Sequence, residues 1–110
     1  MIYHLVDPNV WEQVLDSDQN TYAAPSLESE GFIHCSTREQ LIPTAIAHFE
    51  AFDELVVLEI LPKKIKPILK YEPSREGEEF PHVYGRIPLK AVENTFMIMR
   101  LPGKEWEEVH

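Results

Sequence analysis

Runs of apolar residues predict the strands of this chain. The strongest run is residues 55–61, which is apolar except for Glu59, and a nearly continuous apolar run is typical of a central strand. The first six residues form a shorter run, and the remaining strand signals mix apolar and polar residues. The predicted strands are residues 1–6, 32–36, 55–61, 68–72, 83–84 and 96–101.

Two further segments have the apolar spacing of amphipathic helices. The first, residues 8–15, follows Asp7, whose side chain can cap a helix, and it begins with proline at the first helical position. The second follows Thr37 and Gln40, which have the spacing of a capping box. We expect its regular part to start near Pro43, because proline lacks the amide proton that an interior helical position needs.

The apolar faces of these two helices need a sheet to cover them. Trp11 and Phe49 lie on those faces, so we expect both to be core residues rather than ligand contacts. Residues 59–72 join two strands through a segment too short and too rich in proline for a crossover helix, so much of the sheet should be antiparallel. The pattern therefore predicts one α+β domain, with a charged, frayed tail at residues 104–110 apart from Trp106.

Composition and charge narrow the class of protein. A hydrophobic fraction of 44% and a charged fraction of 26% are typical of a globular domain and exclude a disordered chain. Lys and Arg total 10 against 19 Asp and Glu, a net charge of −9, so we expect neither nucleic acid nor a membrane surface as a partner. The single cysteine, Cys35, allows no intramolecular disulfide, and the N-terminus lacks a signal-peptide pattern, so we expect a cytoplasmic protein.

Three histidines, His4, His34 and His82, lie in strand-like segments. Because side chains alternate along a strand, His34 shares a face with Ser36, and His82 would share one with Tyr84. A single histidine on such a face is usually structural, but three in so short a chain predict that the imidazoles line one polar pocket. Neutral imidazole donates through one nitrogen and accepts through the other, which suits it to ribose hydroxyls or to acid–base chemistry.

Other kinds of site compete with this interpretation. A metal-dependent hydrolase would combine the three histidines with a carboxylate, but no pair has the helical spacing of a His-Glu-x-x-His motif, and we expect no bound metal. Glu59, inside the apolar strand, and Glu72, at a strand end, are the candidate carboxylates. Cys35 is expected to be a small buried residue rather than a nucleophile. The remaining alternative is a binding module that holds a small metabolite in the same pocket without turnover.

Three motifs resemble the signature of a family of small bacterial and plant proteins that is catalogued only as a numbered domain of unknown function. They are Ile-Tyr-His-Leu-Val at residues 2–6, Glu-Gly-Phe-Ile-His-Cys-Ser at 30–36 and Phe-Pro-His-Val-Tyr-Gly at 80–85. By remote similarity this family is grouped with the ADP-ribosyltransferase-like superfamily. That superfamily binds NAD or an ADP-ribosylated intermediate in the cleft of a split, largely antiparallel sheet. The resemblance implies such a fold, with two or three short helices, for a single domain over residues 1–110.

The resemblance also implies a function and site roles. The chain would act on NAD or an ADP-ribose-like nucleotide by ADP-ribosyl or phosphoryl transfer, with NAD as substrate and no metal. The superfamily usually stacks nicotinamide on a tyrosine of its second motif, and no tyrosine stands there in this chain. The expected catalytic residues are His82, as acid/base, and Glu72, as its electrostatic partner; the expected ligand-binding residues are His4 for the ribose, His34 and Ser36 for the adjoining diol or phosphate, and Tyr84 as a pocket wall.

Overall fold

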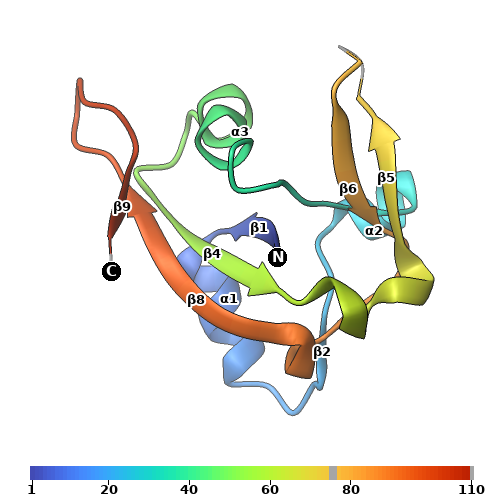
Figure 1. Cartoon of the computed structure of the whole chain (residues 1–110). Coiled ribbons are helices and arrows are strands. Elements are labelled where there is room, and N and C mark those ends of the chain that lie inside the picture. The colour runs from blue at the N-terminus through green and yellow to red at the C-terminus, as the bar shows by residue number, and fades with distance from the viewer. Residues whose placement is uncertain (75–76, 110) are drawn as a thin grey trace.

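The main sheet has four antiparallel strands in the order β1-β4-β8-β9 (Figure 1). The computed structural model describes residues 1–74 and 77–109. The strands are β1 (Ile2–Val6), β4 (Glu54–Ile60), β8 (Val92–Met99) and β9 (Glu107–Val109). Strand β4 lies inside this sheet, and its residues 55–58 are all buried, as its continuous apolar run predicts.

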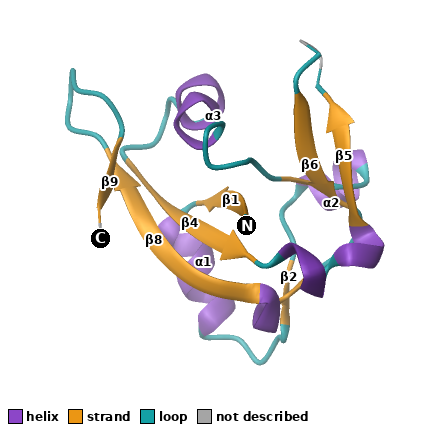
Figure 2. Cartoon of the chain, in the orientation of Figure 1, coloured by secondary structure: helices purple, strands orange, loops and turns teal. Residues whose placement is uncertain are grey.

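A second sheet has three antiparallel strands in the order β3-β6-β5 and stands apart from the main sheet (Figure 2). Its strands are β3 (Ile33–His34), β5 (Leu69–Pro73) and β6 (Glu79–Val83), and a separate two-stranded sheet pairs β2 (Thr21–Tyr22) with β7 (Ile87–Pro88). One isolated bridge joins β1 to the end of the β3 segment, where the backbone groups of Tyr3 and Ser36 exchange hydrogen bonds of 2.8 and 2.7 Å. The expected split, antiparallel α+β architecture is therefore present.

Three short α-helices and three 3₁₀ turns connect the strands. The helices are α1 (Pro8–Leu15), α2 (Ser26–Glu30) and α3 (Leu41–His48), and the turns are η1 (Pro62–Lys64), η2 (Lys66–Ile68) and η3 (Leu89–Ala91). Asp7 caps α1 by accepting a hydrogen bond of 3.0 Å from the backbone N–H of Asn9. Helix α3 begins at Leu41 rather than near Pro43, because a proline in the first turn removes an N–H that has no partner within the helix.

Two apolar clusters fill the two faces of the main sheet. Helix α1 and the inner side of the second sheet supply the first cluster, which includes Trp11, Ile33 and Val83. Helix α3 covers the second cluster, which includes Trp106. Trp11 is buried as predicted, whereas Phe49 is half-buried and packs against the edge of the second cluster. The radius of gyration, 13.5 Å, is close to the ~13 Å expected of one domain of this length.

The end of the chain differs from the expectation of a frayed tail at residues 104–110. Residues 107–109 form strand β9, which pairs with β8 through the Met99–Glu107 register. Trp106, the expected exception, is buried. Residue 110 lies outside the described residues. All three residues of β9 are exposed, so no apolar pattern marks this strand in the sequence.

Other strand boundaries also shift. The strand predicted at residues 32–36 is regular only over Ile33–His34, and the last long strand runs over Val92–Met99 instead of 96–101. The shifts place polar residues 93–95 inside a strand, where they are exposed on the sheet surface. Within residues 1–74 and 77–109, no helix has both the length and the apolar character needed to cross a bilayer.

Candidate functional site

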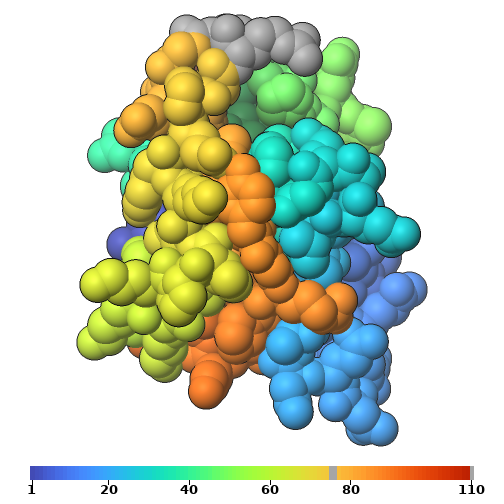
Figure 3. All heavy atoms as spheres, turned by 90° about the vertical axis from the view of Figure 1, so that its right-hand side faces the viewer, coloured from blue at the N-terminus to red at the C-terminus, as the bar shows by residue number. Residues whose placement is uncertain are grey.

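One face of the β3-β6-β5 sheet gathers most of the predicted site residues. Ile33 and Val83 point into the first core cluster, so alternate residues of these strands point to the opposite face. Figure 3 shows β6, in orange, between the yellow β5 segment and cyan residues of the α2–β3 region. We call this surface the site face; its residues are Phe32, His34, Ser36, Lys70, Glu72, Phe80, His82 and Tyr84.

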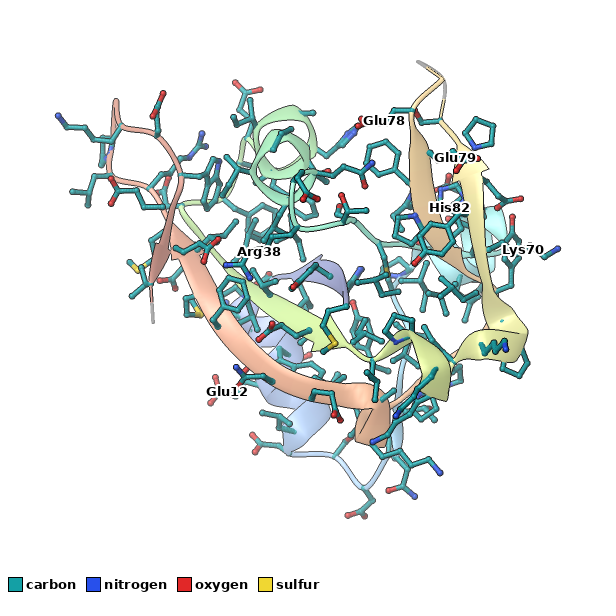
Figure 4. All side chains as sticks on the ribbon, viewed as in Figure 1. Glu12, Arg38, Lys70, Glu78, Glu79 and His82 are labelled. Atoms are coloured by element: carbon teal, nitrogen blue, oxygen red, sulfur yellow. The ribbon has the colours of Figure 1, made fainter. Side chains whose placement is uncertain are left out.

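The strand registers arrange the site face in rows. His34 of β3 pairs with His82 of β6, which in turn pairs with Lys70 of β5. Figure 4 shows Lys70 and His82 on these neighbouring strands. The next row along β6 pairs Phe80 with Glu72. Residues 30 or more positions apart in the chain are thereby neighbours on one surface.

The carboxylate of Glu72 holds a small hydrogen-bond network together. Its Oε1 atom accepts a hydrogen bond from the hydroxyl of Tyr84 and lies 2.9 Å from Nδ1 of His82. These two contacts, that of Tyr84 first, lower the pKa of Glu72, and the contact with Glu72 raises the pKa of Tyr84. An ionised carboxylate only accepts hydrogen bonds, so Nδ1 of His82 must carry a proton.

The other ring nitrogen of His82, Nε2, is available to a ligand. Among the described residues, no protein group forms a hydrogen bond with it. In the neutral imidazole, a proton on Nδ1 leaves Nε2 as an acceptor. The ring of Phe32 stacks on the imidazole with centroids 4.1 Å apart and an interplanar angle of 24°, which fixes its plane. His82 is therefore an oriented proton acceptor.

Phe32 also contacts the other rings of the site face. It meets His34 edge-on, with centroids 4.8 Å apart, and lies tilted against Tyr84 at 5.4 Å. The imidazoles of His34 and His82 are 5.7 Å apart, centroid to centroid. His34 is exposed, and its Nε2 lies 3.1 Å from the carboxylate of Glu30. The face thus offers stacked rings beside two imidazoles.

Helix α3 borders the site face at the Ser36 end. The Ser36 hydroxyl is buried and lies 3.2 Å from the hydroxyl of Thr44, and the Gln40 amide donates a 2.7 Å hydrogen bond to the carbonyl of Glu79. The Gln40 carbonyl also accepts from the Thr37 backbone N–H, which is half of the predicted capping box. A cleft of about 340 Å³ lies between α3 and the β5–β6 hairpin, with Phe80 among its lining residues.

His4 does not join His34 and His82, so the expectation of one pocket lined by three imidazoles is wrong. Its Nδ1 lies 2.7 Å from the backbone carbonyl of His34, and its Nε2 lies 2.8 Å from the hydroxyl of Tyr22. Burial lowers the pKa of His4 to about 4, so the ring is neutral, with Nδ1 donating and Nε2 accepting. His4 lies in the core beneath β3, where both nitrogens are already used.

The arrangement needed for a three-histidine metal hydrolase is not formed. In the described part of the chain, no three His, Cys, Asp or Glu side chains are placed to hold a metal ion together. Glu59, the other candidate carboxylate, lies on β4 and accepts a hydrogen bond of 3.0 Å from Asn94. Cys35 is buried, and burial raises the pKa of its thiol.

Sequence reasoning missed several residues of this site. The period of two assigns Phe32 to the face of His34 and Phe80 to the face of His82, although neither ring was predicted to be a site residue. Lys70, in contrast, reaches the face only through the pairing of β5 with β6. Thr44 lies on a helix, and no local pattern connects it with Ser36.

Comparisons with known proteins agree with this fold. The family model described as "Protein of unknown function (DUF952)" matches residues 5–95. The crystal structure of protein CC0527 from Caulobacter crescentus is similar, with a TM-score of 0.84 and 26% identity, covering 96% of this chain and 92% of that one. The solution NMR structure of CC0527 gives a TM-score of 0.77 and 27% identity, covering 94% and 90%. No curated protein matches the chain.

Proposed function

Since the chain belongs to the DUF952 family of proteins of unknown function, we propose a function from its site face: a small cytoplasmic enzyme that acts on NAD or an ADP-ribose-like nucleotide. The observation that carries this proposal is the 2.9 Å contact between Glu72 Oε1 and His82 Nδ1, which leaves His82 Nε2 for a ligand. An imidazole oriented by a carboxylate can take a proton from a hydroxyl and return it to a leaving group.

The other residues of the face have roles that follow from their positions. His82 is the general acid/base, and Glu72 keeps the proton on its Nδ1. His34 is proposed to bind the diol or phosphate beside the reacting group, whereas Ser36, whose buried hydroxyl contacts Thr44, supports the face without touching the ligand. His4, which was expected to hold the ribose, instead supports the site from the core by fixing the carbonyl of His34.

The nucleotide class is supported by the rings and by the charge. Phe32 offers aromatic surface for a base, and imidazoles suit ribose hydroxyls. Lys70 is the only lysine or arginine of the site face, and the chain carries a net charge of −9. Recognition through rings and hydroxyls is therefore favoured over recognition through many phosphate contacts.

The carboxylate of Glu72 could also serve ADP-ribosyl transfer. In that reaction the C–N bond to nicotinamide breaks, the pair of electrons leaves with nicotinamide, and an acceptor oxygen bonds to the ribose carbon while its proton passes to His82. Positive charge develops on the ribose, and a positioned carboxylate stabilises it. Oε2 of Glu72 makes no hydrogen bond to the described residues, so this oxygen can face the substrate.

Titration calorimetry with NAD, ADP-ribose and adenosine at pH 5.5 and pH 8, with an assay for released nicotinamide, tests the proposal. His82→Gln and Glu72→Gln should each abolish nicotinamide release, whereas Glu12→Gln, at an exposed position of helix α1, should leave it unchanged. If none of the three ligands binds at millimolar concentration at either pH, the nucleotide proposal fails.

A binding module without turnover is the second candidate. The observation that favours it is that Oε1 of Glu72 already accepts two hydrogen bonds from the protein, which reduces its capacity to stabilise a further positive charge. The same experiment separates the two functions. Binding of NAD without nicotinamide release, with wild-type protein and candidate acceptors, would select the binding module.

A further inference from the structure

We propose that Tyr84 is a positioning residue rather than a wall of the ligand site: its hydroxyl fixes the carboxylate of Glu72 and, through it, the proton of His82 on Nδ1. The inference rests on the proposed acid/base role of His82 and adds a third member to that pair. It concerns an arrangement that exists before any ligand binds. It can therefore be tested even if the nucleotide proposal fails.

Two hydrogen bonds meet at one oxygen atom of Glu72. Tyr84 and His82 both contact Oε1 of Glu72, while Oε2 makes no hydrogen bond to the described residues. The side chain of Glu72 is 35% exposed, so neither packing nor burial alone restricts its rotamers. The hydroxyl of Tyr84 is the contact that holds the carboxylate against His82.

Tyr84 is itself held in place by contacts of its backbone and its ring. Its backbone N–H donates a 2.7 Å hydrogen bond to the carbonyl of Ile68, and its ring packs against Phe32. The ammonium group of Lys70 lies 5.1 Å from the centre of the same ring. Because the backbone and the ring of Tyr84 are both held, its hydroxyl is confined to one position beside Glu72.

The consequence concerns which nitrogen of His82 carries the proton. While Glu72 stays in place, it accepts from Nδ1 and keeps Nε2 free as an acceptor. Without the Tyr84 hydroxyl, the half-exposed carboxylate can turn towards water, and His82 can then carry its proton on either nitrogen. The share of molecules with an acceptor at Nε2 falls accordingly.

The variant Tyr84→Phe removes only the hydroxyl and keeps the ring. Nitrogen-15 NMR of the His82 imidazole at pH 8 should show one tautomer, protonated on Nδ1, in the wild type and a mixture in the variant. Carbon-13 NMR of the Glu72 carboxyl group should show an upward shift of its pKa in Tyr84→Phe. Affinity for ADP-ribose should fall roughly threefold to tenfold, as expected for the loss of one supporting hydrogen bond.

The matched control is Tyr71→Phe. Tyr71 is an exposed tyrosine of β5 that lies on the face opposite to Glu72, so its hydroxyl should affect neither NMR signal nor affinity. A Tyr84→Phe protein with unchanged His82 tautomer and unchanged Glu72 titration would overturn the inference.

A double-mutant cycle with Glu72→Gln separates positioning from direct ligand contact. If Tyr84 acts through Glu72, adding Tyr84→Phe to Glu72→Gln should change neither the His82 signal nor the affinity further. An equal loss of affinity in both backgrounds would show that Tyr84 touches the ligand, which contradicts the inference. If wild-type protein binds no ADP-ribose but the NMR results hold, only the nucleotide proposal is lost.

Discussion

His4, the hydroxyl of Tyr22 and the carbonyl of His34 form a short hydrogen-bonded chain inside the protein. Because the buried imidazole of His4 is neutral, its Nδ1 donates a hydrogen bond and its Nε2 accepts one. These hydrogen bonds connect the core with the backbone of His34, a residue of the site face. A residue that resembles a ligand contact in the sequence is therefore part of the support beneath the site.

This burial makes stability depend on pH. The pKa of His4 in the folded protein is about 4, below the ~6.5 of an exposed histidine. Its contribution to the free energy of unfolding is therefore fully present above pH 6.5. As pH falls from 6.5 to 4, the unfolded chain takes up a proton that the folded chain does not, and the free energy of unfolding falls by roughly 3 kcal/mol. Urea denaturation at pH 7 and pH 4.5 measures this. The pH-dependent part should be lost in His4→Gln and kept in His48→Gln.

Trp11 and Phe49 differ in burial although both were predicted to be core residues. Trp11 is 8% exposed within the first cluster, so Trp11→Ala should lower the free energy of unfolding by ~3–5 kcal/mol. Phe49 is half-buried at the end of α3, so Phe49→Ala should cost clearly less. Urea denaturation of both variants gives the comparison. Equal losses would show that the edge of the second cluster is packed as tightly as the first.

At the scale of elements, the C-terminal segment allows the contribution of side-chain burial to stability to be measured apart from that of strand pairing. Trp106 is buried in the second cluster, whereas every residue of β9 is exposed. Trp106→Ala should therefore cost ~3–5 kcal/mol, and removal of residues 107–110 should cost less. The truncation loses the strand pairing and the surface ion pair between Arg38 and Glu108, and such pairs contribute at most about 1 kcal/mol.

A second variant tests the polar atom of Trp106. Its indole Nε1 is buried and has no hydrogen-bond partner among the described residues, so Trp106→Phe removes an unfavourable group as well as apolar area. We expect Trp106→Phe to cost less than half of Trp106→Ala, measured by thermal and urea denaturation. A phenylalanine variant as unstable as the alanine variant would contradict this.

Elements could be predicted from the sequence where a local pattern specifies them. Helix α1 has its expected bounds because Asp7 and Pro8 mark its start, and β4 follows from its apolar run. Strand β9 could not be predicted, since its pairing with β8 provides its hydrogen bonds and its one apolar residue, Val109, forms no alternating pattern. Some features of the site could likewise be predicted from a local pattern, and others could not. The face shared by His34 and Ser36 follows from alternation, but the contact of Glu72 with His82 depends on a register between strands that composition does not specify.

At the scale of the whole molecule, one backbone bridge, between Tyr3 and Ser36, joins the two larger sheets in the part of the chain that the structure describes. Strand β4 has a partner on each side and a buried centre, whereas β5 is an edge strand with mostly exposed residues. We therefore expect amide hydrogens of β4 to exchange slowest and those of β5 much faster, because the hairpin can open without unfolding the main sheet. Hydrogen-exchange mass spectrometry checks this. Equal protection of β4 and β5 would show that the two sheets unfold as one unit.

The alternation along β6 has a consequence for protein engineering. Pro81 and Val83 point into the core, while Phe80, His82 and Tyr84 lie on the site face. A combinatorial library confined to Phe80 and to Lys70 on the neighbouring strand, with His82 and Tyr84 kept, would vary ligand preference while leaving the hydrogen-bond network and the packed interior intact. New specificities could therefore be selected from this small scaffold with few members lost to misfolding.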